Sequence, residues 1–89
     1  MKFYYVYILL SKKDYKFYIG CTNDFKRRYF EHQRGENTST ATRLPLQLIF
    51  YEAYLSKKDA LRREHYFKTT KGKAILKNML KESLMLISN

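Results

Sequence analysis

Five side chains that could act together on a phosphodiester bond are spread through the sequence in a regular order. Tyr7 and Tyr18 stand in short apolar runs with ten residues between them, Arg28 and His32 follow at a spacing of four, and Glu64 comes later. A phenol or an imidazole can move a proton, a guanidinium can bind a phosphate, and a carboxylate can hold a divalent cation. Together these groups are the parts that phosphoryl transfer needs.

The two tyrosines are expected to lie on a β-hairpin. Residues 3–10 and 15–20 are rich in aromatic and β-branched side chains, and the polar residues 11–14 between them predict a turn. Side chains alternate along strands, so Tyr5 and Tyr7 share one face, and Tyr18 and Gly20 share one. The opposite, core face would hold Val6, Ile8, Phe17 and Ile19. Alternatively, the tyrosines are ordinary residues of amphipathic strands. Gly20 lacks a side chain, so backbone or substrate could approach closely there.

Arg28 and His32 are expected on one face of a helix. Thr22, Asn23 and Asp24 offer N-cap chemistry, residues 25–34 have helical character, and Gly35 is a natural stop. Residues four apart are neighbours on a helix surface, so the guanidinium and the imidazole could serve one site. An exposed arginine beside a surface histidine is the other interpretation.

The second half of the chain predicts a loop, a strand and two helices. Residues 36–43 are polar, and residues 46–55 form a strand that is apolar on both faces, which predicts a central strand covered on both sides. Ser56 can cap a helix over residues 57–70. Gly72 interrupts, and a last helix is expected over residues 73–83. The apolar tail of residues 84–87 either extends that helix or packs on the sheet.

Glu64 is the most unusual of the five side chains, because it falls in register with Ala60, Leu61 and Phe67, which should face the sheet. A carboxylate at the margin of an apolar stripe needs a partner. A divalent metal ion is one candidate. Lys68, four residues further on, is the other.

The composition predicts one domain with an anionic partner. Eighty-nine residues leave room for one core, so residues 1–89 should form a single domain. Lys and Arg number 18 against 8 Asp and Glu, a net charge of +10. This surplus favours binding to nucleic acid, although a merely basic protein or one on an anionic membrane would share it. Basic residues are dense from Lys57 to Lys81, and the junction over residues 68–73 could take phosphates.

The cysteine content and the apolar runs favour a cytoplasmic protein without a membrane partner. Cys21 is the only cysteine, which excludes an intramolecular disulfide and a zinc site built on cysteines. The apolar run at residues 3–10 is short and lacks the small-residue cleavage site of a signal peptide. No segment approaches the roughly 18 apolar residues needed to cross a bilayer.

Taken together, these residues resemble the GIY-YIG nuclease domain over nearly the whole chain. Residues 5–7 (Tyr-Val-Tyr) stand in the GIY place, where only the final tyrosine is kept, and residues 18–20 are Tyr-Ile-Gly. Residues 22–32 follow the family's next helix. Residues 60–73 are similar to the small, stand-alone bacterial members, some of which are grouped with DNA repair.

The resemblance implies an α/β fold of the α+β kind, with a central three-stranded antiparallel sheet flanked by helices, and metal-dependent hydrolysis of DNA. Tyr7 would be the general base or would orient the attacking water, and Tyr18 would assist it. His32 would accept or relay the proton, and Arg28 would stabilise charge on the phosphate. Glu64 would hold one Mg²⁺ or Mn²⁺. Nucleic-acid contacts are expected from Gly20, Lys68, Lys71, Lys73 and Asn78, the last in the place of a late family asparagine.

The first functional hypothesis is therefore a metal-dependent endonuclease that hydrolyses DNA phosphodiester bonds, with a role in DNA repair or recombination. The alternative is a DNA- or RNA-binding module with little activity on the same scaffold. A purely structural protein would leave the five side chains unexplained. The sequence leaves open the metal, the oligomeric state and the choice between DNA and RNA.

Overall fold

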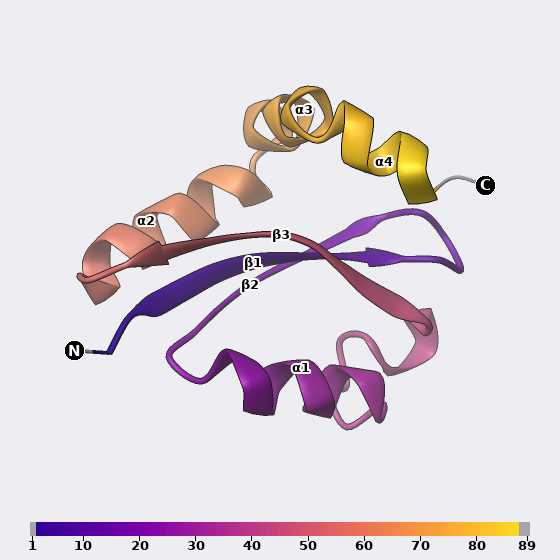
Figure 1. The fold of residues 1–89 in the computed structure, drawn as a ribbon, viewed down its shortest axis with the longest axis horizontal. Coiled ribbons are helices and arrows are strands. Elements are labelled where there is room, and N and C mark those ends of the chain that lie inside the picture. Colours follow the sequence, from indigo (N-terminus) through magenta and orange to yellow (C-terminus); the bar gives the residue numbers. More distant parts are fainter. Residues whose placement is uncertain (1, 88–89) are drawn as a thin grey trace.

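A three-stranded antiparallel sheet separates one helix from three others in the computed structural model, which describes residues 2–87 (Figure 1). The strands β1 (Tyr4–Ser11) and β2 (Phe17–Thr22) form a hairpin, and β3 (Leu46–Tyr54) pairs with the other edge of β1. Helix α1 (Phe25–Gln33) covers one face. Helices α2 (Lys57–Lys68), α3 (Thr70–Met79) and α4 (Lys81–Ile87) lie over the other. The expected α+β class, with a three-stranded antiparallel sheet flanked by helices, is confirmed.

Each face of the sheet has its own core, as the alternation of side chains predicts. Val6, Ile8 and Ile19 pack with residues of α2 and α3, among them Phe67. Tyr7, Leu9 and Leu46 pack on the α1 side, with Tyr18, Phe25, Tyr29, Leu44 and Leu48 against them. Because successive residues of β1 point to opposite layers, this strand carries Tyr7 into the α1 layer while its neighbours fill the other core.

The prediction that residues 46–55 form the central strand is wrong. The strand order is β2-β1-β3, so β1 is central and β3 lies at an edge. Every residue from Val6 to Ser11 is buried, whereas β3 is mostly half-buried. With helices over both faces, an edge strand also needs apolar side chains on both sides, and hydrophobic alternation does not distinguish the two positions.

The helices after β3 also end at different places from those predicted. The break falls at Thr69, whose hydroxyl donates to the Tyr66 carbonyl at 2.6 Å and accepts from the Gly72 amide at 3.0 Å. Thr69 therefore ends α2 and caps α3. Gly72 does not interrupt a helix: it is buried inside α3, where a Cβ would collide with the Tyr66 backbone. The chain breaks again at Leu80, and residues 84–87 belong to α4.

The local signals that begin α1 and α2 are confirmed. The Asp24 side chain accepts a hydrogen bond from the Arg27 amide and caps α1, and the Ser56 side chain accepts one from the Asp59 amide and caps α2. Gly35 follows α1 with φ of +72°, a left-handed conformation that glycine adopts readily. Within residues 2–87, the helices are all too short or too polar to traverse a lipid bilayer.

Candidate active site

Tyr7 lies in the α1 layer with its ring directly over Gly20. The two residues are partners across the β1–β2 hairpin, and a Cβ on residue 20 would collide with the Tyr7 ring and hydroxyl. The ring is also packed edge-on against Phe25, with centroids 5.5 Å apart. The Tyr7 ring thus occupies the space in front of Gly20. Because residue 20 has no side chain, the Tyr7 hydroxyl can lie at this position.

The Tyr7 hydroxyl begins a chain of buried hydrogen bonds through His32 to Thr40. It lies 3.1 Å from Nε2 of His32, and Nδ1 of His32 lies 2.8 Å from Oγ1 of Thr40. Tyr7 is 1% exposed, and His32 and Thr40 are fully buried. When the Nδ1 proton is donated to Thr40, Nε2 is left with a lone pair that accepts the Tyr7 proton. The chain is therefore suited to transferring a proton away from Tyr7.

Tyr18 joins the same group from β2. It pairs with Leu9 rather than with Tyr7, so the two tyrosines are diagonal neighbours, with ring centroids 6.3 Å apart. Its ring lies closer to His32, at 4.8 Å and edge-on. Tyr18 is half-buried, whereas Tyr7 is covered. Both tyrosines therefore pack on the α1 side of the sheet, and Tyr18 is the more exposed of the two.

Burial keeps both Tyr7 and His32 neutral at neutral pH. Burial, followed by the nearby Tyr18, raises the pKa of Tyr7 to about 12, and the Arg28 guanidinium offsets only part of this rise. Burial, with the Arg28 charge added, lowers the pKa of His32 below 6.5. At Tyr7, desolvation therefore outweighs the effect of the positive charge on Arg28.

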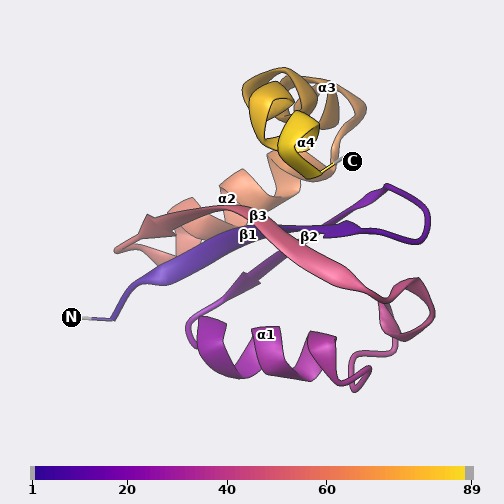
Figure 2. The ribbon, with the colours of Figure 1, turned by 45° about the vertical axis from the view of Figure 1, so that its right-hand side comes forward.

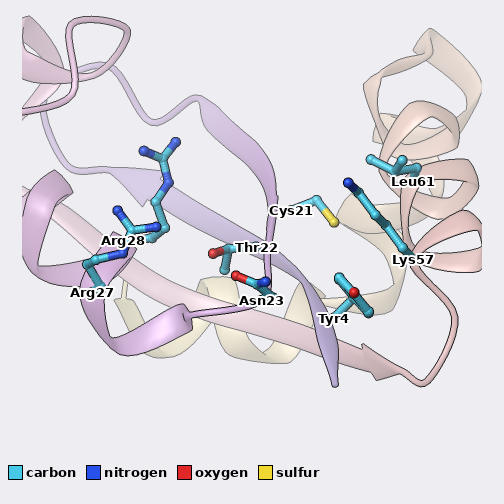
Figure 3. A pocket seen from close by; sticks show the side chains of 8 residues that line it. All are labelled: Tyr4, Cys21, Thr22, Asn23, Arg27, Arg28, Lys57 and Leu61. Atoms are coloured by element: carbon cyan, nitrogen blue, oxygen red, sulfur yellow. The ribbon is translucent and has the colours of Figure 1, made fainter. Parts of the chain in front are cut away.

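A groove of about 360 Å³ opens beside these residues, along the edge of the sheet formed by β2. In Figure 3, Arg27 and Arg28 reach into it from α1, and Lys57 and Leu61 reach in from α2. Between them lie Tyr4, Cys21, Thr22 and Asn23. We call this the β2-edge groove. Three of its lining side chains are cationic, and Arg28 is oriented by an ion pair with Glu31 at 3.1 Å, so the groove is suited to a phosphate.

Glu64 lies on the face of α2 that borders this groove. Lys57, Leu61 and Glu64 follow one another at spacings of four and three, so they share one side of the helix. Burial is the main cause of the raised pKa of both Cys21 and Tyr7, and the Glu64 carboxylate adds to the rise at each. It also pairs with Lys68 at 3.4 Å, so the simpler of the two partners proposed for it is present.

The environment of Glu64 fits a cation shared with a bound phosphate. Its side chain is only 13% exposed, while the paired Lys68 is 54% exposed and free to move aside. Within residues 2–87, no three His, Cys, Asp or Glu side chains gather into a ready metal-binding group. Mg²⁺ is often held by one or two carboxylates, with water and substrate phosphates completing its shell, whereas zinc needs three or four protein ligands. The donor set therefore suits Mg²⁺ or Mn²⁺ and not zinc.

Of the residues expected to contact nucleic acid, most lie away from the β2-edge groove. Lys71, Lys73 and Asn78 are exposed on α3 and do not line the β2-edge groove. Lys68 borders the site through its pair with Glu64. Gly20 is covered by Tyr7, which leaves no room for a direct contact at that residue.

Sequence reasoning missed Thr40 and the groove residues Arg27, Asn23 and Lys57. Thr40 stands in a hydroxyl-rich loop among Thr38, Ser39 and Thr42, and nothing in the sequence distinguishes it from them. Its burial under His32 follows from how residues 36–43 return to the sheet, where the Ser11 hydroxyl donates to the Arg43 carbonyl at 2.6 Å. Only a surplus of Ser and Thr close to the histidine in sequence hinted at such a partner.

Comparisons with known proteins agree with this geometry. Residues 3–79 match the model of the GIY-YIG catalytic domain. A UPF0213 protein of Limosilactobacillus reuteri is 46% identical over 68 residues, covering 73% of this chain and 70% of the relative. A UPF0213 protein of Lactiplantibacillus plantarum is 39% identical over 80 residues, covering 86% and 78%. The solution NMR structure of the UPF0213 protein BH0048 from Bacillus halodurans has a TM-score of 0.56 and 35% identity, covering 86% of this chain and 84% of that one.

Proposed function

Because the chain belongs to the GIY-YIG catalytic domain family, we propose that it is a metal-dependent endonuclease that hydrolyses DNA phosphodiester bonds in DNA repair or recombination. The family implies a nuclease, and the names of the relatives specify no activity. The observation that carries the proposal is the hydrogen-bonded chain from Tyr7 through His32 to Thr40, next to a cationic groove. In a protein that only bound DNA, this chain would serve only to satisfy buried polar groups.

In the proposed reaction, Tyr7 and His32 remove the proton of the attacking water. With a pKa of about 12, Tyr7 stays protonated near neutral pH. The phenol oxygen takes the water proton while its own proton passes to Nε2 of His32, so no free phenolate forms. The resulting hydroxide forms the new P–O bond as the bond to the leaving oxygen breaks. Donation from Nδ1 to Thr40 supports the imidazolium that this transfer creates.

Arg28 and Glu64 would provide the electrostatic part of the mechanism. The Arg28 guanidinium lines the groove and would bind the non-bridging oxygens of the phosphate. Glu64 would hold the Mg²⁺ or Mn²⁺ ion, whose chemistry is Lewis-acid stabilisation of the phosphate and the leaving oxygen. Lys68 would release Glu64 when a cation binds and turn towards the phosphate backbone.

A second candidate, a nucleic-acid-binding module with little activity, is favoured by one observation. Tyr7 is 1% exposed, so water must reach its hydroxyl from the side of Arg28 and Tyr18 when substrate binds. If the residues that cover Tyr7 never move apart, the groove can still bind a phosphate, but Tyr7 cannot take a proton from the attacking water.

A cleavage screen separates the two candidates. Labelled branched, flap and plain duplex DNA would be incubated with the protein in Mg²⁺, in Mn²⁺ and in EDTA, and products would be resolved on denaturing gels. The nuclease proposal expects metal-dependent cuts in at least one substrate. Binding to all of these substrates without any cut, in either metal, would favour the binding module.

Replacing Thr40 by valine should lower kcat about 10- to 100-fold and leave KM nearly unchanged, because the partner that orients a catalytic imidazole is lost while the groove is untouched. The change would be read from initial cleavage rates at several DNA concentrations. Thr40→Ser is the matched control, since it keeps the hydroxyl and should restore most of kcat. Equal losses in the valine and serine variants would contradict the role of Thr40 in positioning His32.

The pH profile of cleavage should have its acid limb below pH 6.5. His32 must be neutral to accept a proton, and burial lowers its pKa from 6.5, so its acceptor form persists to lower pH than that of an exposed histidine. The measurement is kcat between pH 4.5 and 8.5. His65→Gln, at the only other histidine, should leave the limb in place because that side chain is exposed. A midpoint at or above 6.5 would argue against buried His32 as the acceptor.

A further inference from the structure

A second basic pocket lies at the tip of the β1–β2 hairpin and shares no residue with the β2-edge groove. It has a volume of about 500 Å³ and is lined by Tyr15, Lys16, Phe17, Arg43, Lys73 and Lys77. Figures 1 and 2 both show the hairpin tip lying between the α3–α4 helices on one side and η1 (Ala41–Arg43) on the other. We call this the hairpin-tip pocket.

The positive charge of this pocket favours an anionic ligand. Four of its six lining residues are cationic. Arg43 is engaged with Asp14 at 3.3 Å and with the Phe17 carbonyl at 3.2 Å. Lys16, Lys73 and Lys77 have no acidic partner within the described residues 2–87. Lys73 and Lys77 are four apart on α3 and so point to the same side. Three uncompensated ammonium groups around one cavity favour a ligand with several negative charges, such as a phosphate backbone.

Tyr15 adds a feature that charge alone does not explain. Its φ is +56°, a left-handed conformation that favours glycine at this place in a hairpin loop. The loop holds it there, because the Tyr15 amide donates to the Ser11 carbonyl at 2.8 Å and the Lys16 amide donates to the Asp14 carboxylate at 3.0 Å. The side chain is 57% exposed and makes no ring contact with any residue of the described chain. An exposed aromatic ring in a strained backbone conformation can instead stack on a ligand with a flat face.

The pocket lies next to the candidate active site across a single strand. Phe17 lines the pocket, and Tyr18, its neighbour in sequence, belongs to the tyrosine group on the other face of β2. Since β2 is an edge strand, a polynucleotide held beside Tyr18 can pass over the start of β2 and reach the pocket. The bases of a duplex are stacked on one another, so only an unpaired base can offer its face to Tyr15.

We propose that the hairpin-tip pocket binds an unpaired DNA strand adjoining the cleavage site, with Tyr15 stacked on a base and Lys16, Lys73 and Lys77 contacting phosphates. This inference rests on the proposed nuclease function and specifies its substrate class: duplexes that carry a single-stranded tail or flap. Arg43 holds the loop in shape through Asp14 and Phe17, so the pocket is formed before the strand arrives.

The test compares binding of a tailed duplex with binding of the same duplex lacking the tail, by fluorescence anisotropy in EDTA so that nothing is cut. The wild-type protein should bind the tailed DNA about tenfold more tightly, the effect of stacking one base. Tyr15→Gly should remove most of this preference and leave only the contribution of the lysines. It should leave binding of the blunt duplex unchanged and raise the melting temperature by about 4 °C, because the strain is relieved. Lys73→Gln with Lys77→Gln should weaken tailed binding more than blunt binding.

Two control variants test whether losing any exposed aromatic ring, or any two positive charges, would have the same effect. Tyr51 is also 57% exposed but lies on β3, outside the pocket, so Tyr51→Ala should keep the tenfold ratio. Lys58→Gln with Lys81→Gln removes the same charge from exposed helix positions outside the pocket and should weaken both substrates equally. A wild-type ratio near one, or a Tyr15→Gly variant that keeps the preference, would overturn the inference even if the protein cuts DNA. If the wild-type protein prefers the tailed DNA, Tyr15→Gly loses this preference, and the protein never cuts DNA, the pocket inference would stand and the nuclease proposal would fail.

Discussion

Replacing Glu64 by glutamine should abolish metal-dependent cleavage, with a loss of at least about 10²- to 10³-fold, while DNA binding stays intact or becomes slightly stronger. Glutamine is nearly isosteric, so the side chain should still fit in the largely covered place that Glu64 occupies on α2. The change removes the charge that would hold the cation and that would repel phosphate in its absence. Cleavage rates, anisotropy with DNA in EDTA, and Mn²⁺ binding by titration calorimetry would be measured on the same preparation.

The ion pair with Lys68 provides the control for this experiment. A pair between residues four apart with a half-exposed lysine stabilises a helix by about 0.3–0.5 kcal/mol, so Glu64→Gln and Lys68→Gln should each change the melting temperature by only a few degrees. If the role of Glu64 is only to pair with Lys68, the two variants should behave alike in cleavage. A folded Glu64→Gln protein that cuts DNA at the wild-type rate would remove the metal assignment.

Replacing Tyr7 by phenylalanine should lower kcat by about 10²- to 10⁴-fold, because the phenol oxygen that passes the water proton to His32 is lost. The ring should remain over Gly20 and against Phe25. The buried Nε2 of His32 loses its partner, so the free energy of unfolding should fall by about 1–3 kcal/mol. Single-turnover cleavage and thermal unfolding by circular dichroism would be measured together, at a temperature where the variant is folded.

Tyr29→Phe is the matched control for Tyr7→Phe. Tyr29 belongs to the same aromatic group, stacked on Phe25 with centroids 5.8 Å apart, and its hydroxyl has no part in the proposed reaction. Its removal should leave kcat unchanged. If Tyr7→Phe cuts as fast as Tyr29→Phe, the proton passes by another route, and half-buried Tyr18 becomes the first residue to examine.

The local signals in the sequence were sufficient to predict most elements and their order. Alternation along residues 3–10 indicated which side chains of β1 enter each layer, and the caps at Asp24 and Ser56 placed the starts of α1 and α2. These features depend on residues close in sequence, whose geometry is set by hydrogen bonding and side-chain period. The same short-range patterns placed Arg28 and His32 on one helix and Glu64 on another.

The order of the strands, the ends of the helices, and the protonation and orientation of the site residues depended on contacts between residues distant in sequence. An apolar pattern on both faces of β3 fits a central and an edge strand equally, and pairing with β1 decided the matter. Gly72 suggested a helix stop, but close packing against Tyr66 keeps it inside α3.

By itself, the sequence determined the family of this protein, its α+β class and the chemical groups available for a reaction, since these follow from residue types and their spacing. Only the tertiary structure decided how those groups are tuned. Burial raises the pKa of Tyr7 to about 12 although Arg28 lies nearby, and a loop residue eight positions away, Thr40, fixes the orientation of His32. Desolvation and buried hydrogen bonds arise from the surrounding layers of the fold, and no local pattern in a sequence encodes them.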